Sequence, residues 1–157
     1  MEIENRIQFL DGAMGTQLQA KGLPAGASPE LFMMEHGEII EEVHAAYIES
    51  GSDIIYTNTF TANAKKLKNT GYTVEEIITR GVQLARSATR KKEGVRIALD
   101  IGPIGELLEP NGYLPFEEAY ELFRQQVVAG EQAGADLIIF ETMSDLYEVK
   151  AAILAAK

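Results

Sequence analysis

The feature that most constrains the fold of this chain is a short apolar run that stops at a carboxylate. Residues 135–140 are preceded by Gly134 and followed directly by Glu141. A continuous apolar run of this length, between a glycine and a helix start, predicts a strand that is buried on both faces. A carboxylate at the end of such a strand costs free energy unless it is paired or binds something. Glu141 is therefore a candidate functional residue.

The same order of apolar run, polar end, loop and amphipathic segment occurs four times, in units of roughly forty residues. The predicted strands cover residues 7–11, 53–58, 96–100 and 135–140. A loop of about twenty residues follows the first strand, broken by Pro24, Gly26 and Pro29, and holds a short helical turn at 16–20. The main predicted helices cover 38–50, 73–92, 115–132 and a last segment after residue 144, and a short one covers 64–68.

Several residues mark where these helices begin and end. Thr73 and Glu76 have the spacing of a capping box. Gly51 stands where a helix of this kind ends, and Gly134 leads into the next strand. Ser144 is the predicted cap of the last helix, whose expected apolar side is formed by Leu146, Val149, Ile153 and Ala156.

Alternating strands and helices predict a parallel sheet with right-handed crossovers. We expect one α/β domain over residues 1–157, since this length supports a single core of ordinary size. Two architectures fit the pattern. One is an open doubly wound sheet, and the other is half of an eight-unit barrel, which needs about 250 residues when complete.

Composition excludes several classes of function. The formal net charge of -10 argues against nucleic acid or an anionic membrane surface as a partner. The absence of cysteine excludes disulfides, thiolate metal sites and a cysteine nucleophile within the chain. The acidic start, residues 1–6, lacks the features of a signal peptide, and no apolar run has the roughly 20 residues of a membrane span. We expect a cytoplasmic protein.

Polar side chains stand at the predicted C-terminal ends of all four strands: Asp11, Asn58, Asp100 and Glu141. Both architectures place their active sites at this edge of the sheet. Acids and an amide that converge there would suit a ligand ammonium group, a hydroxyl or a hard metal ion. The alternative is that each residue only caps a helix or fixes a loop.

Other motifs carry less information. The glycine loops at 12–15 and 102–105 lack the dinucleotide-binding fingerprint and a phosphate-binding lysine, which favours tight turns. His36 and His44 have no partner at metal-ligand spacing. We interpret His44 as a structural residue and His36 as a surface residue, and expect neither to bind metal.

Four motifs together resemble the homocysteine S-methyltransferase family. They are residues 10–18, 57–60, 102–105 and 140–142, which occur in family order and span essentially the whole chain. The resemblance is closest to the homocysteine-binding module of the cobalamin-dependent members. It implies a (β/α)8 barrel and a zinc ion that binds the homocysteine sulfur as a thiolate, which lowers the pKa of the thiol.

The resemblance also implies roles for residues of this chain. Asp11 and Glu141 would engage the ammonium group of homocysteine, while Asn58, Thr59 and the backbone of Gly12 would shape the pocket. The zinc ligands of the family are three cysteines from the second half of the barrel, and this chain contains none. Cobalamin or folate stays open as a cofactor of the parent protein, and the methyl donor is undetermined.

We therefore expect a parallel (β/α)4 half of a (β/α)8 TIM-type barrel, which by itself is inactive in methyl transfer. Its first and fourth strands would be open edges, which favour pairing with another chain and hence a homo-oligomer. One alternative is a non-catalytic, self-associating half-barrel folding unit. Another is an open α/β enzyme that uses Asp11, Asp100 and Glu141 around a hard metal.

Overall fold

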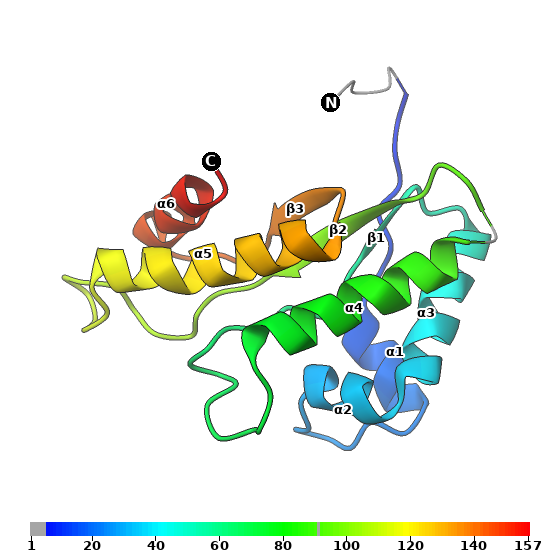
Figure 1. Ribbon diagram of the computed structural model, residues 1–157, viewed down its shortest axis with the longest axis horizontal. Helices are drawn as coiled ribbons and strands as arrows, with labels where there is room; N and C mark the ends of the chain where they lie inside the picture. Colours follow the sequence, from blue (N-terminus) through cyan, green and yellow to red (C-terminus); the bar gives the residue numbers. More distant parts are fainter. Residues whose placement is uncertain (1–5, 91) are drawn as a thin grey trace.

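The computed structural model describes residues 6–90 and 92–157 (Figure 1). Helices and strands alternate over most of that range, after an N-terminal part that holds three helices. In chain order the elements are α1 (Met14–Ala20), α2 (Pro29–Glu35), α3 (Gly37–Ser50), β1 (Ile54–Tyr56), α4 (Val74–Thr89), β2 (Arg96–Ile101), α5 (Phe116–Ala133), β3 (Leu137–Phe140) and α6 (Leu146–Ala155). Within the described ranges, no helix combines the length and apolar character that crossing a membrane requires.

The three strands are parallel and lie in the order β1-β2-β3. Their register places Ile55 beside Ile97 and Leu99 beside Ile138. Sequential parallel strands joined by right-handed crossovers bring their connecting helices to one face of the sheet. The helices accordingly pack on one another in chain order, α3 on α4, α4 on α5 and α5 on α6, as Figure 1 shows. This arrangement confirms the predicted parallel α/β architecture.

The side of β2 that faces the helices forms the main core. Leu99 packs so closely on α5 that a Cβ atom at Gly130 would lie 2.3 Å from Leu99 Cδ2. Phe140 of β3 meets the buried Phe123 edge to face, with ring centroids 6.0 Å apart. Each fully buried side chain of this size contributes roughly 1.5–3 kcal/mol through its burial. Because side chains alternate along a strand, Asp100 lies on the opposite side of the sheet from Leu99.

Helix ends agree with several predictions. Thr73 Oγ1 accepts a hydrogen bond from Glu76 N, and Glu76 Oε2 accepts one from Thr73 N, which completes the predicted capping box. Gly51 and Gly134 end α3 and α5 in the left-handed region, with φ of 112° and 89°. Glycine adopts this conformation without a steric penalty, so the helices stop where the sequence indicated.

The predicted first strand, residues 7–11, is reduced to a single bridge between Leu10 and Ile54. The segment does run parallel to β1, because Asp53 N donates to Phe9 O and Asp11 N donates to Ile54 O. No described strand pairs with its other side, and Phe9 is 62% exposed. The position was predicted correctly, and a regular strand was not formed.

The prediction that residues 135–140 form a strand buried on both faces is wrong. All four residues of β3 are only half-buried. The strand pairs with β2 on one side, and no described strand pairs with it on the other. Within the described chain, β3 is therefore a half-buried edge strand of the sheet.

The last helix is capped and oriented differently from the prediction. Asp145, not Ser144, is the N-cap of α6, and its carboxylate accepts a hydrogen bond from Tyr147 N. Small residues and one carboxylate face the core, and the larger apolar side chains do not: Leu146 is 85% exposed and Ile153 is 45% exposed. The predicted apolar stripe therefore points away from this chain.

Two local predictions also fail. The segment 64–68 forms turns, not a helix. The predicted twenty-residue loop contains the additional helix α2, whose first residue is Pro29. Ser28 caps this helix through its hydroxyl, and proline suits the first helical position because its missing N–H is not needed there. Pro29 therefore begins a helix and does not act as the breaker that we predicted.

Candidate functional site

Polar residues from separate parts of the chain meet at the carboxyl ends of the strands, around a cavity of about 470 Å³. Of the predicted site residues, this cavity brings together Asp11, Gly12, Asn58 and Glu141. Thr59 does not line it. The other lining residues are Leu10, Ala13, Met14, Gly15, Pro29, Glu30, Tyr56, Thr57, Phe60, Thr61 and Asp100.

Asp11 is held at the cavity by the neighbouring strand. Its backbone N–H donates to Ile54 O at 3.0 Å, and its Oδ2 accepts from Tyr56 N at 3.0 Å. Burial raises the pKa of Asp11 to about 6, against the lowering effect of the hydrogen bond from Tyr56, and the nearby carboxylate of Glu141 raises it further. Asp11 therefore keeps its proton to a higher pH than an aspartate in water does.

Gly12 allows helix α3 to approach the first loop. A Cβ atom at this position would lie 2.9 Å from Tyr47 Oη, which is closer than carbon atoms of side chains approach a hydroxyl. The same Tyr47 hydroxyl donates to Ala13 O at 3.0 Å and fixes the loop. Gly12 therefore lets Tyr47 pack against the loop whose backbone lines the cavity.

A closed chain of hydrogen bonds joins the end of β1 to the end of β2. The Asp100 N–H donates to Thr57 Oγ1, and Thr59 Oγ1 donates to Asp100 O at 2.8 Å. Thr57 Oγ1 lies 2.6 Å from Thr59 Oγ1. Because Thr59 has already used its only proton, Thr57 is the donor in this contact. Thr59 therefore lies behind the cavity and positions the backbone of Asp100.

The loop after β1 is also anchored to α2 by a buried carboxylate that was not among the predicted site residues. Glu30 Oε1 accepts from Thr61 N at 2.7 Å and from Thr61 Oγ1 at 2.8 Å, while Glu30 Oε2 accepts from Ser28 Oγ at 2.7 Å. Asn58 Nδ2 donates to Pro29 O at 2.8 Å beside it. The order Ser28, Pro29, Glu30 is a helix-start signal that could have placed Glu30 on α2.

Glu141 directly follows β3, and its N–H donates to Ile101 O at 3.1 Å. The next residue, Thr142, has a φ of 58°, which is an outlier for a β-branched side chain. Such strain persists only where surrounding contacts enforce it, and it gathers at functional sites. It occurs here next to the carboxylate that ends the last predicted strand.

Asp100 is the most perturbed group that lines the cavity. Burial, followed by the carboxylates of Glu141, Asp11 and Glu30, raises the pKa of Asp100 to about 8. None of the side chains that line the cavity is a lysine, arginine or histidine. A cavity that holds several carboxyl groups without a basic side chain favours a cationic ligand group.

The histidines lie outside this cavity. His44 is fully buried in α3, no described group forms a hydrogen bond with its ring nitrogens, and burial lowers its pKa to about 4. His36 packs against the ring of Phe32 and lies 3.8 Å from Glu38, with its side chain 43% exposed. Both positions agree with the structural and surface roles that we expected.

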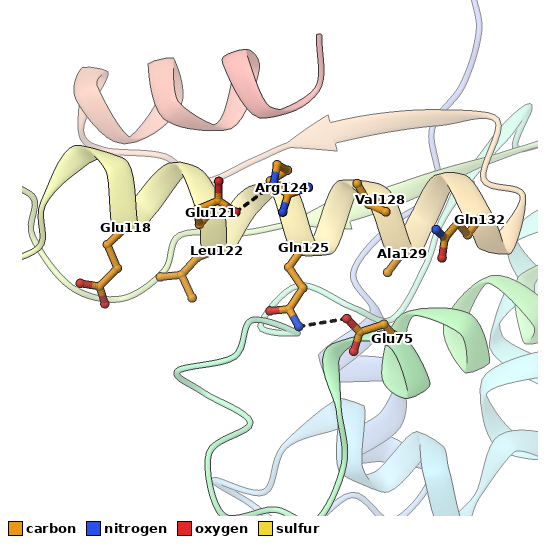
Figure 2. A pocket seen from close by; sticks show the side chains of 9 residues that line it. All are labelled: Glu75, Glu118, Glu121, Leu122, Arg124, Gln125, Val128, Ala129 and Gln132. Atoms are coloured by element: carbon orange, nitrogen blue, oxygen red, sulfur yellow. Dashed lines mark hydrogen bonds and ion pairs between the residues drawn. The ribbon is translucent and has the colours of Figure 1, made fainter.

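A second hollow, of about 540 Å³, lies on the outer side of α4 and α5 (Figure 2). Four of its polar side chains bond in pairs: Gln125 Nε2 donates to Glu75 Oε1 at 3.0 Å, and Arg124 Nε donates to Glu121 Oε2 at 2.8 Å. None of the strand-end residues lines it. This hollow is lined by α5 and by Glu75 of α4 alone, and the strand-end cavity is the candidate functional site.

The residues of this chain do not fit the zinc site that the sequence resemblance implies. Thiolate ligands are absent because the sequence contains no cysteine. Across residues 6–90 and 92–157, no group of three or more histidine or acidic side chains is arranged to hold a metal ion. The alternative of a hard metal among Asp11, Asp100 and Glu141 therefore finds no support in the described structure.

Comparison with known proteins identifies relatives of the chain. A sequence model described as Homocysteine S-methyltransferase matches residues 8–157. The Methionine synthase of Mycobacterium tuberculosis (strain ATCC 25618 / H37Rv) is 28% identical over 170 residues, and that of Mycobacterium leprae (strain TN) is 28% identical over 167 residues. Each alignment covers 99% of this chain but only 14% of the relative.

The comparison with solved structures agrees with the sequence comparison. The crystal structure of the homocysteine methyltransferase MmuM from Escherichia coli, in its metallated form, has a TM-score of 0.84 at 26% identity. That match covers 96% of this chain and 59% of the other, and the oxidized form matches with a TM-score of 0.83 at 27% identity. The family match over residues 8–157 confirms the resemblance, and the chain belongs to the homocysteine S-methyltransferase family.

Proposed function

We propose that this chain binds the amino-acid end of homocysteine, as part of a protein that transfers a methyl group to the homocysteine sulfur to form methionine. The observation that carries this proposal is the strand-end cavity, where the carboxyl groups of Asp11 and Glu141 meet without a basic side chain among the lining residues. A ligand ammonium supplies the positive charge that such a cavity lacks. Membership of the family favours homocysteine as the amino acid that the cavity binds.

The architecture supports a proposal in which this chain binds the amino acid and does not activate the sulfur. We propose that residues 1–157 form one (β/α)4 domain, equivalent to the first half of a (β/α)8 barrel. The sequential parallel strands, the row of helices on one face and the exposed edge at β3 support this. We assign binding and orientation of the amino-acid end to this chain, since it contains no cysteine to activate the sulfur through zinc.

Calorimetric titration of the chain with L-homocysteine tests the proposal. We expect a single site in the wild type, with affinity reduced at least tenfold by Asp11→Asn and by Glu141→Gln, because each variant removes a charge that faces the ammonium group. 4-Mercaptobutanoate, which keeps the thiol and the carboxylate but lacks the amino group, is expected not to bind.

Glu121→Gln is the matched control for these two variants. It removes the same charge from the exposed outer side of α5, so its affinity for homocysteine should equal that of the wild type. If folded wild-type protein does not bind homocysteine, or binds the deaminated analogue equally well, the proposal is wrong.

A second candidate function, a self-associating half-barrel unit, is favoured by a specific observation. We propose that two copies cover each other's exposed apolar surfaces. At one edge of the sheet Ile7 and Phe9 are exposed, and on α6 at the other side Leu146, Ile153 and their neighbours line an apolar hollow of about 620 Å³. Unpaired strand edges and apolar patches of this kind favour association between chains.

Light scattering at several protein concentrations tests this second candidate. We expect the wild type to form a discrete dimer of twice 17.2 kDa. The double variant Leu146→Glu, Ile153→Glu should form a weaker dimer, which dissociates at protein concentrations where the wild type is still dimeric. Tyr113→Glu is the control, because Tyr113 is 97% exposed on a loop outside both surfaces. A mass of one chain at every concentration would exclude self-association.

A further inference from the structure

Asp100 has a side chain for which the described fold provides no partner. Its Oδ1 atom is buried, and no described group forms a hydrogen bond with it. The residue is only 8% exposed. Its backbone, in contrast, is bonded on both sides by Thr57 and Thr59. A buried carboxyl oxygen without a donor costs free energy, so its presence requires an explanation beyond packing.

The position of Asp100 suggests what would satisfy it. Its side chain lies on the face of the sheet opposite the helices and lines the strand-end cavity together with Asp11, Glu141 and Glu30. Tyr56, on the neighbouring strand, is the other titratable residue that lines this cavity. The backbone bonds to the two threonines fix Asp100 in place, so the carboxyl group is presented to the cavity by a rigid element.

We propose that Asp100 is a third acceptor for the ammonium group of the ligand, and that it releases a proton to solvent when the ligand binds. This inference rests on the proposed function. The ligand enters as an ammonium ion, Asp100 changes from carboxylic acid to carboxylate, and the displaced proton leaves to buffer. The nitrogen keeps its three protons, so charge and atoms balance. In the ligand-free protein, the proton on Asp100 neutralises the carboxylate that the ligand ammonium would otherwise neutralise.

The titration behaviour of the cavity supports this coupling. Burial and the carboxylates of Glu141, Asp11 and Glu30 raise the pKa of Asp100 to about 8, so that the group is mainly protonated at neutral pH when no ligand is present. A cation placed beside these groups favours their charged forms and lowers their pKa values. Binding must then become tighter as pH rises toward 8, because a smaller fraction of the protein still carries the Asp100 proton that has to leave on binding.

Calorimetry in buffers of different ionisation enthalpy measures this proton directly. At pH 7 we expect the wild type to release close to one proton for each L-homocysteine bound, and its affinity to rise about tenfold for each pH unit between 6.5 and 7.5. L-2-Aminobutyrate, which has no thiol, should give the same proton count. That result would show that the proton does not come from the ligand sulfur.

Asp100→Asn is the decisive variant, and Glu121→Gln is its control. We expect Asp100→Asn to bind with almost no proton release and with an affinity that is nearly independent of pH over the same range. Glu121→Gln should behave as the wild type. Circular dichroism establishes that each variant is folded, and the pH dependence of the wild type tests the proposal even if Asp100→Asn does not fold.

The outcomes separate this inference from the function on which it rests. Binding by the wild type without proton release, or an unchanged pH dependence in folded Asp100→Asn, overturns the role of Asp100 and leaves homocysteine binding intact. Absence of binding by folded wild type at every pH overturns both.

Discussion

Replacing Glu30 with alanine is expected to reduce the free energy of unfolding by about 3 kcal/mol. Glu30 is 1% exposed, and its carboxylate accepts hydrogen bonds from Ser28 Oγ, Thr61 N and Thr61 Oγ1. A hydrogen bond to a charged group contributes roughly 1.5–3 kcal/mol, and donors left without a partner in a buried site add to the loss. The expected value is lower than the sum, because water enters the space that the side chain vacates.

The same substitution should weaken the binding of homocysteine, since Glu30 fixes the loop that carries Asn58 to the wall of the cavity. Urea denaturation and calorimetric titration measure the two effects. Glu30→Gln keeps an oxygen acceptor for Thr61 and should fall between wild type and alanine. Glu35→Ala, at the exposed end of the same helix, should change stability by less than about 0.5 kcal/mol. Equal stability of Glu30→Ala and wild type would show that the clamp contributes nothing.

The assembly of the site was predictable from sequence because parallel strands share a direction. Asp11, Asn58 and Glu141 stand up to 130 residues apart in the sequence, yet each follows an apolar run, and the carboxyl ends of parallel strands meet at one edge. The structure confirms that they line one cavity. This inference required only the spacing of the apolar residues and the positions where the apolar runs end, and both can be read from short stretches of sequence.

Other features depend on contacts that local patterns do not contain. The apolar residues of α6 have helical spacing, but spacing alone does not indicate which surface the helix meets. The structure buries the side with Ala151 and Ala152 and exposes Leu146. Likewise, β3 has the composition of a buried strand but lacks a second neighbour within the described chain. A pattern indicates which residues are suited to burial, and only the surrounding elements determine whether they are buried.

Glu30 and Asp100 illustrate the same limit for polar residues. In the sequence, Glu30 follows a serine and a proline in an apparent loop, while Asp100 resembles the other strand-end acids. The first is saturated with hydrogen bonds, and the second has a buried oxygen that no described group bonds. Whether a buried carboxyl group is satisfied depends on side chains far away in sequence, and that distinction separates a structural acid from a candidate ligand-binding acid.

Asp100→Asn is expected to stabilise the ligand-free protein at pH 8, by an amount on the order of 3 kcal/mol. The pKa of Asp100 is about 8 in the folded protein, against 3.8 for an aspartate in water. Between these values the folded state holds a proton that the unfolded state has lost, so the free energy of unfolding falls as pH rises from about 4 to about 8. Each pKa unit corresponds to about 1.4 kcal/mol, and relaxation of the cavity reduces the total.

Urea denaturation at pH 5 and at pH 8 measures this effect. The wild type should lose stability over the interval, whereas Asp100→Asn should lose much less, because an amide does not titrate. Asp11, whose pKa is raised to about 6, accounts for the pH dependence that remains in the variant between about 4 and 6. Glu121→Gln also removes one negative charge but should retain the full wild-type dependence. If Asp100→Asn and the wild type lose the same stability, Asp100 is ionised in the folded protein, and the proton assigned to ligand binding must come from another group.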